Sequence, residues 1–163
     1  MAAQARSYKA RGVVLRARNL GEADRILTLF TLEHGKLEGV AKGLRRARSR
    51  VGGRLEFGNE VALTLHRGRS LDVISSSEIL REHWQALVEP QRFAVAAAAC
   101  EMIDALSEPD LPMPDVYELL VGMLAAIATS PQARGLLPRF SMRLLEALGV
   151  APPVDACIRC ANR

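Results

Sequence analysis

The sequence predicts an α+β fold in which a small closed β-barrel is followed by an α-helical domain. Up to about residue 80, apolar side chains alternate with polar ones in short runs separated by glycine-containing turns, which is the pattern of β-strands. Beyond that point they recur every three or four residues, which is the pattern of amphipathic helices. We therefore expect a barrel domain over 1–80, a helical domain over 81–156 and the start of a further region at 157–163.

Five strands are expected in the barrel, and they cover 8–18, 24–32, 36–42, 55–67 and a last run that begins at Leu71. Turns are expected at 19–22, 34–35 and 68–70. In the third strand we expect Leu37 and Val40 to point inward and Gly39 to mark a bulge or a bend. Alternation in the fourth strand places Val61, Leu63 and Leu65 on one face. Five short strands in a meander with glycine bends are typical of a five-stranded OB-fold β-barrel.

Three helices are expected after the barrel. The first covers 91–107 and carries the apolar stripe Phe93, Ala97, Cys100, Ile103 and Leu106. The second begins at Asp115 and carries Val116, Leu119, Leu120, Met123, Leu124 and Ile127. The third covers 134–148 and carries Leu137, Phe140, Leu144, Leu145 and Leu148, with Gly149 in the C′ position that favours a left-handed backbone.

Positive charge is concentrated at the amino-terminal end of the chain. Residues 1–54 hold 13 Lys/Arg and 4 Asp/Glu, a balance of +9, whereas residues 55–80 (2 basic, 4 acidic) sum to −2 and residues 81–163 (7 basic, 10 acidic) to −3. The densest part carries seven basic residues against Glu38: Lys36, Lys42, Arg45, Arg46, Arg48, Arg50 and Arg54. We expect residues 43–54, with three glycines and little to bury, to form a flexible basic loop.

This basic segment favours nucleic acid as the ligand. Lys and Arg neutralise phosphates and release condensed counterions, and Arg binds phosphate oxygens in a bidentate manner. Single-strand binders usually stack bases on aromatic rings, but the barrel offers only Tyr8, Phe30 and Phe57, and Phe30 alternates with core positions. Binding through phosphate with little sequence preference is therefore expected. An RNA-binding OB module, or an adaptor whose basic loop binds acidic protein tails, remains an alternative.

Motifs for catalysis are missing from the sequence. We find no Walker loop, no G-x-G-x-x-G, no H-E-x-x-H and no serine nucleophile elbow, so we do not expect an enzyme. Cys157 and Cys160 have the C-x-x-C spacing of two zinc ligands, which makes half of a tetrahedral site. Cys100 lies on a helical apolar stripe and is expected to be buried. We expect no cofactor in this chain, and zinc only in a full-length protein that supplies further ligands.

The chain holds no run of 18 apolar residues and no apolar leader after Met1. We therefore expect a cytoplasmic, nucleoid-associated protein without membrane contact.

The amino-terminal part resembles the signature of the RecO recombination mediators of bacteria. The matching stretches are 12–15 (GVVL), 21–31 (GEADRILTLFT), 33–37 (EHGKL), 40–43 (VAKG) and 45–46 (RR). The order of an OB barrel, a helical domain and a C-x-x-C that opens a zinc-finger region agrees as well. Since family members usually run some tens of residues further, the chain resembles a fragment truncated within the zinc-finger region.

The resemblance implies a role in DNA repair and homologous recombination. RecO proteins bind single- and double-stranded DNA, anneal complementary strands and load RecA together with RecR on DNA coated by the single-strand binding protein (SSB). Their helical domain recognises the acidic carboxy-terminal tail of SSB. Carried over by position, Lys36, Lys42, Arg45, Arg46 and Arg48 are expected to bind the DNA backbone. We expect Arg11, Arg16, Arg18 and Arg25 to extend this patch if their strand faces point outward, and Arg50 of the basic segment is a further DNA-binding candidate.

Overall fold

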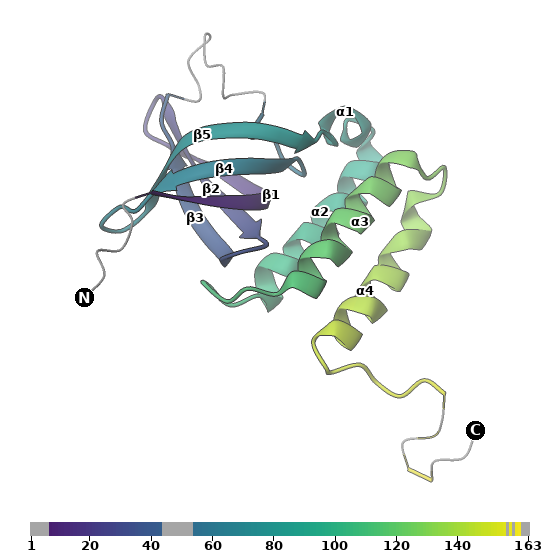
Figure 1. Cartoon of the computed structure of the whole chain (residues 1–163). Helices are drawn as coiled ribbons and strands as arrows, with labels where there is room; N and C mark the ends of the chain where they lie inside the picture. Colours follow the sequence, from purple (N-terminus) through teal and green to yellow (C-terminus); the bar gives the residue numbers. More distant parts are fainter. Residues whose placement is uncertain (1–6, 44–53, 156, 158, 161–163) are drawn as a thin grey trace.

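The computed structural model describes residues 7–43, 54–155, 157, 159 and 160. Its barrel is built from β1 (Ser7–Leu20), β2 (Asp24–Thr31), β3 (Gly35–Ala41), β4 (Glu60–His66) and β5 (Asp72–Arg81). Its helices are α1 (Trp84–Leu87), α2 (Pro90–Leu106), α3 (Pro114–Thr129), the 3-10 turn η1 (Ala133–Gly135) and α4 (Leu136–Ala147). The helices lie together at one side of the barrel (Figure 1). The predicted fold class is confirmed, whereas the domain limits at 80 and 156 remain predictions.

The strands form a closed barrel in the order β1-β2-β3-β5-β4, so the expectation of a simple meander is wrong. β3 pairs in parallel with β5, from Gly39 opposite Asp72 to Ala41 opposite Ile74. β1 pairs with both β2 and β4 and closes the barrel. Consecutive strands must pair as a hairpin only where a short turn joins them. The stretch between β3 and β4 is long, so these two strands need not be neighbours in the barrel.

Gly39 does not mark a bulge, because β2–β3 pairing runs through it without a shift in register. It is a site of close approach instead: a Cβ atom there would lie 3.1 Å from Cγ1 of Ile74 on the neighbouring strand. The inward anchors of β3 also differ from the expectation. Ala41, and not Val40, joins Leu37 in the barrel core, because the two are separated by an even number of residues.

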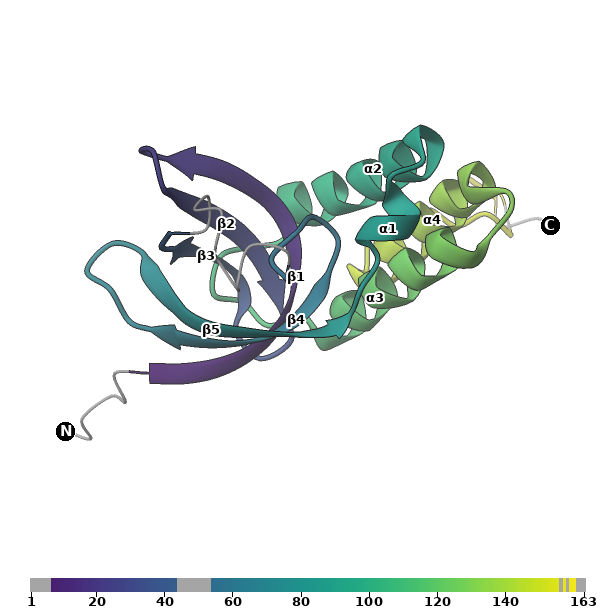
Figure 2. The same ribbon diagram turned by 90° about the horizontal axis from the view of Figure 1, so that it is seen from above.

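The barrel has two buried faces. Its interior is filled by Val61, Leu63 and Leu65 of β4, by Leu55 of the segment before β4, and by side chains of the other strands, which are Ala10, Val14, Leu27, Leu29, Leu37, Ala41 and Ile74. The outward face of β1 and β2 is covered by helices (Figure 2). There Val13, Leu15 and Phe30 belong to the same buried cluster as α2 and α3. The predicted burial of Phe30 is confirmed, with 0% of its surface exposed.

The predicted stripe of α2 is rotated relative to the buried face. The buried residues are Val95, Ala96, Ala99, Cys100 and Ile103. Phe93 and Leu106, which were expected to be buried, are 42% and 48% exposed. This helix is apolar on nearly all sides, so its sequence does not define a single inward direction. The helices α3 and α4 follow their predicted spacing more closely, and Gly149 has the expected positive φ of 72°.

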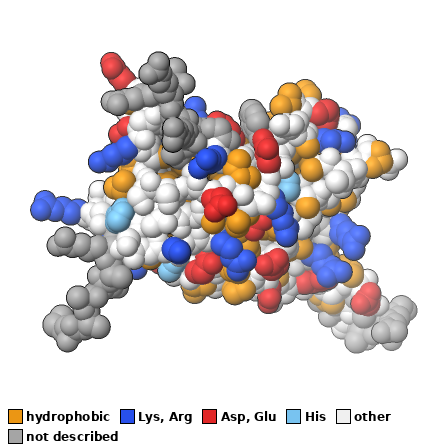
Figure 3. All heavy atoms as spheres, turned by 45° about the horizontal axis from the view of Figure 1, so that its top comes forward, with side chains coloured by type: hydrophobic (Ala, Val, Ile, Leu, Met, Phe, Trp, Pro, Cys, Tyr) orange, Lys and Arg blue, Asp and Glu red, His pale blue; other side chains and the backbone are white. Residues whose placement is uncertain are grey.

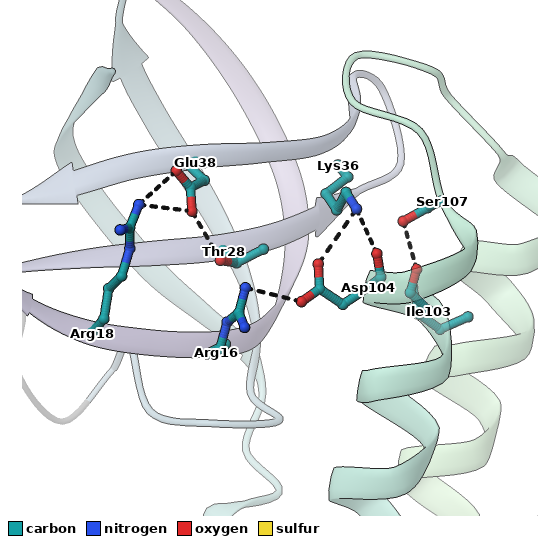
Figure 4. A network of polar contacts seen from close by, with 8 residues as sticks. All are labelled: Arg16, Arg18, Thr28, Lys36, Glu38, Ile103, Asp104 and Ser107. Atoms are coloured by element: carbon teal, nitrogen blue, oxygen red, sulfur yellow. Dashed lines mark hydrogen bonds and ion pairs between the residues drawn. The ribbon is translucent and has the colours of Figure 1, made fainter. Parts of the chain in front are cut away.

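An ionic cluster joins the barrel to α2 (Figure 4). The Asp104 carboxylate of α2 lies 3.1 Å from Nη2 of Arg16 on β1 and 3.4 Å from Nζ of Lys36 on β3. Lys36 Nζ also donates to the backbone carbonyl of Asp104, and the Asp110 amide donates to the carbonyl of Lys36 at 3.0 Å. Close by, a Cβ atom on Gly35 would lie 2.1 Å from the carbonyl oxygen of Leu111, so the β2–β3 turn packs directly on the α2–α3 linker.

We expect Asp104→Asn to lower the free energy of unfolding by roughly 1–2 kcal/mol, because Lys36 loses its carboxylate partner while remaining largely buried. Only 18% of the Lys36 side chain and 22% of the Asp104 side chain are exposed. The exposed pair of Arg143 with Glu146 provides the control, since both side chains are more than half exposed. Denaturant unfolding should show almost no effect of Glu146→Gln, and an equally small effect of Asp104→Asn would contradict the role of the cluster.

Candidate nucleic-acid interface

A shallow groove of about 690 Å³ crosses the outer surface of β1, β4 and β5. Register places Lys9 opposite Thr64 and Arg11 opposite Ala62, and Thr64 in turn lies opposite Ser76. The middle of the groove is therefore lined by small side chains, with basic side chains at its β1 edge. Such a surface leaves room for an extended chain to lie against the barrel.

Among the residues that the structure describes, three basic side chains line this groove, namely Lys9, Arg11 and Arg54. Arg54 is held in place because its Nη1 donates to the carbonyl of Ser77 at 2.9 Å. Arg11 is paired with Glu33, whose carboxylate accepts from the Arg11 amide at 2.7 Å and from its Nε at 3.3 Å. Both side chains of this pair are more than one-third exposed, so a phosphate could replace Glu33 at low cost.

A second basic surface lies at the end of the barrel where the chain leaves β3. Arg25 is paired with Ala41 in the β2–β3 ladder, and the next residue, Lys42, is exposed. The carboxylate of Asp24 accepts from the amide of Gly43 at 2.8 Å and so fixes the direction in which the chain departs. The predicted DNA-binding residues Arg45, Arg46, Arg48 and Arg50 lie outside the described residues.

Four of the basic side chains singled out from the sequence contact carboxylates, and the pair of Arg11 with Glu33 is one of these contacts. Arg18 makes a bidentate contact with Glu38 at 2.9 and 3.1 Å. Arg16 and Lys36 share Asp104, and Lys36 is largely buried (Figure 4). On the face drawn in Figure 3, Lys and Arg side chains lie among Asp and Glu side chains and form no continuous basic patch among the side chains described there. Of these carboxylate partners only Asp104 lies outside residues 1–54, so it alone offsets the +9 balance of that stretch, in which Glu33 and Glu38 are already counted.

The predicted residues therefore separate into groups. Arg11 lies in the groove, Arg25 and Lys42 lie at the end of the barrel, and Arg16 and Lys36 lie at the contact with α2. Lys9 and Arg54 line the groove and were not in the predicted set. Lys9 could have been found from the sequence, because it shares a strand face with Arg11 two residues away.

The aromatic side chains left open by the sequence both have partners in the structure. The Tyr8 hydroxyl donates to the Asp72 carboxylate, and its ring makes an edge contact with His34 and lies under the guanidinium of Arg67. Burial, together with the neighbouring Asp72, raises the pKa of the Tyr8 hydroxyl. Phe57 contacts Phe93 of α2, with ring centroids 5.2 Å apart.

The three cysteines lie in two different environments. Cys157 and Cys160 are exposed, and Cys100 is buried in the helical core. Hydrogen bonds from the amides of Arg159 and Cys160 lower the pKa of the Cys157 thiol. In the part of the chain that the structure describes, no group of three or more His, Cys, Asp or Glu side chains is arranged to hold a metal. Two thiols are suitable zinc ligands, but a structural site needs four.

A further groove, of about 330 Å³, lies between α3 and α4. Its apolar lining includes Leu119, Met123 and Phe140, and Arg139 and Arg143 of α4 lie beside them. Among the described helices, none combines the length and apolar character that crossing a membrane would need.

Comparisons with known proteins match both parts of the chain. A family model described as "Recombination protein O N terminal" matches residues 4–83, and one described as "Recombination protein O C terminal" matches residues 88–163. The chain is 41% identical over 160 residues to "DNA repair protein RecO" of Bifidobacterium adolescentis, and 41% identical over 158 residues to the protein of the same name from Bifidobacterium longum subsp. infantis. These matches cover 95% and 94% of this chain, but 64% and 65% of the two relatives.

We expect two of the three cysteines to react quickly with a thiol reagent in the native state. Cys100 is 2% exposed, and burial raises the pKa of its thiol to about 12, so it should react only after unfolding. Counting modified thiols by mass spectrometry before and after adding denaturant checks this. Rapid modification of Cys100 in the folded chain would show that the packing of α2 is not as described.

Proposed function

Because the chain belongs to the RecO family of DNA repair proteins, we propose that it acts as a recombination mediator that binds DNA through its sugar-phosphate chain. In this role it binds single- and double-stranded DNA, promotes strand annealing and, with RecR, loads RecA on DNA coated by SSB. It does so by binding and positioning, without a catalytic residue. The chain spans 64% of the length of the relative from Bifidobacterium adolescentis.

One observation carries the proposal: the arginine-rich segment begins and ends at basic parts of the barrel surface. It leaves the described structure at Gly43, next to Lys42 and Arg25, and returns at Arg54, which lines the groove with Lys9 and Arg11. Four further arginines lie between these two points in the sequence, at 45, 46, 48 and 50. A phosphate chain that follows the segment would therefore meet cations at both of its ends.

We assign phosphate contacts to Arg11, Arg25, Lys42, Arg45, Arg46, Arg48 and Arg50, and add Lys9 and Arg54. Arg16 and Lys36 are assigned instead to holding α2, because both contact Asp104. Cations on one surface can neutralise two strands at once and so lower the repulsion that opposes annealing. Contacts to phosphate carry no sequence information, which suits a mediator that must act on any sequence.

We expect the triple variant Arg45→Ala, Arg46→Ala and Arg48→Ala to weaken DNA binding for all sequences. Each lost phosphate contact should reduce the slope of log K against log salt by up to about one unit. Fluorescence anisotropy across a salt series measures this slope, and running DNA and RNA strands side by side tests the alternative of an RNA-binding module. An unchanged slope would remove these arginines from the interface.

The groove between α3 and α4 supports a second assignment within this proposal, the site for the tail of SSB. An acidic peptide that ends in phenylalanine needs an apolar recess for its ring and cations for its carboxylates. Met123 and Phe140 supply the first, and Arg139 and Arg143 supply the second. This surface is formed by helices, whereas the DNA-binding surface proposed above is formed by the barrel.

The two assignments can be separated by one pair of variants. Arg139→Ala with Arg143→Ala should weaken binding of an acidic, Phe-terminated peptide about tenfold or more and leave DNA binding unchanged, because two charge-assisted contacts are lost. The triple variant Arg45→Ala, Arg46→Ala and Arg48→Ala should weaken DNA binding and leave binding of the peptide unchanged. Peptide titration by anisotropy provides the measurement. If DNA and peptide compete for one surface, or if the barrel variant loses the peptide, the assignment to the α3–α4 groove is wrong.

A further inference from the structure

The groove on the barrel holds acidic side chains as well as basic ones. Besides Lys9, Arg11 and Arg54, the described residues that line it include Glu33 and Glu78. Glu33 lies in the turn between β2 and β3, whereas Glu78 lies on β5. A phosphate that enters the groove therefore meets negative charge as well as positive charge, and the two act on it in opposite directions.

Glu33 is held in the groove by two donors of one residue. Its Oε2 accepts from the backbone amide of Arg11 at 2.7 Å, and its Oε1 accepts from Nε of the same arginine at 3.3 Å. Arg11 lies one residue before Gly12, where the register of β1 with β2 begins, so Glu33 supplies the acceptor that this amide does not find in that ladder. The carboxylate thus fills a position defined by an amide and a guanidinium.

This position has the donors that a phosphate needs. Backbone amides and arginine side chains are the groups with which proteins commonly bind the phosphate oxygens of a nucleic acid. Glu33 therefore stands where a phosphate bound by Arg11 would lie. Because 52% of the Arg11 side chain and 38% of the Glu33 side chain are exposed, their pairing is weak and water can hydrate the carboxylate once it is displaced.

We propose that Glu33 is an internal competitor of phosphate, which occupies the anion position at Arg11 and is displaced when a DNA strand enters the groove. This inference rests on the proposed function and adds a control on the affinity of the same groove. A strand that uses Arg11 has to break the contact with Glu33 first, so the groove holds the strand less tightly than its cations alone would. The carboxylate returns to Arg11 as the phosphate leaves, which suits a mediator that has to release the strand after annealing.

The experiment compares Glu33→Gln with Glu38→Gln. Glutamine keeps an oxygen that can accept from the Arg11 amide but removes the negative charge. Glu38 is the matched control, because it pairs with Arg18 at a similar exposure, 34% and 57%, and does not line the groove. Both variants change the net charge of the chain by the same amount.

In anisotropy titrations of a labelled oligothymidine at low salt, Glu33→Gln should bind about fivefold more tightly than the unaltered chain. Glu38→Gln should bind about as tightly as the unaltered chain. The gain in Glu33→Gln should shrink as salt is raised, because interactions between exposed charges are screened. Thermal unfolding of each variant shows that it is folded.

Removing Arg11 tests whether Glu33 acts through this arginine. In the Arg11→Ala background, Glu33→Gln should give a clearly smaller gain, because the anion position has lost its guanidinium. A gain of undiminished size would show that Glu33 only repels phosphate from a distance, and the role as a competitor would be wrong.

Equal gains in Glu33→Gln and Glu38→Gln would reflect the charge of the whole chain and would overturn the inference. An unchanged affinity of Glu33→Gln would overturn it as well. In both cases binding of DNA by the unaltered chain leaves the proposed function intact. If neither the unaltered chain nor the variants bound the oligomer, the proposed function and the competitor would fail together.

Discussion

The packing of α2 and α3 on the outer face of β1 and β2 is the contact on which the arrangement of the molecule depends. Phe30 of β2 and Tyr117 of α3 lie in one buried cluster, and the Tyr117 hydroxyl donates to the Glu60 carboxylate of β4 at 3.0 Å. Glu60 is 6% exposed and also contacts Arg81 at 3.4 Å. Breaking such a buried polar contact would leave a carboxylate without its partners in the core, which is costly. The barrel and the helices are therefore joined as one body.

This rigidity has a consequence for the surfaces to which we assign ligands. The groove on the barrel and the groove between α3 and α4 belong to elements that share a core, so the distance between a bound strand and a bound peptide is fixed by the fold. His83 lies at the same junction, and burial lowers the pKa of its imidazole, which therefore adds no positive charge there at neutral pH. Under the proposed function, a strand on the barrel groove and a peptide in the α3–α4 groove would therefore be held at a fixed separation.

The sequence predicted the structure best where the pattern of apolar residues allowed only one interpretation. Strict alternation in β4 left one choice for the inward face, and Val61, Leu63 and Leu65 are all buried. In α2 the helix is apolar on nearly all sides, so the choice of Phe93 and Leu106 as buried residues had no physical basis and was wrong. Lys36 was assigned to DNA on its charge, yet its partner Asp104 is 68 residues away, and such a contact is invisible to local pattern. Whether Lys36 also binds DNA stays a prediction. The expected order of strands was wrong because strand order depends on pairing between distant segments.

Annealing places opposite demands on a binding surface, because the strand must be held while its bases stay free to pair. Binding through phosphate meets both demands, since it leaves the base edges exposed. The small side chains Ala62, Thr64 and Ser76 in the groove are consistent with such contact along the backbone.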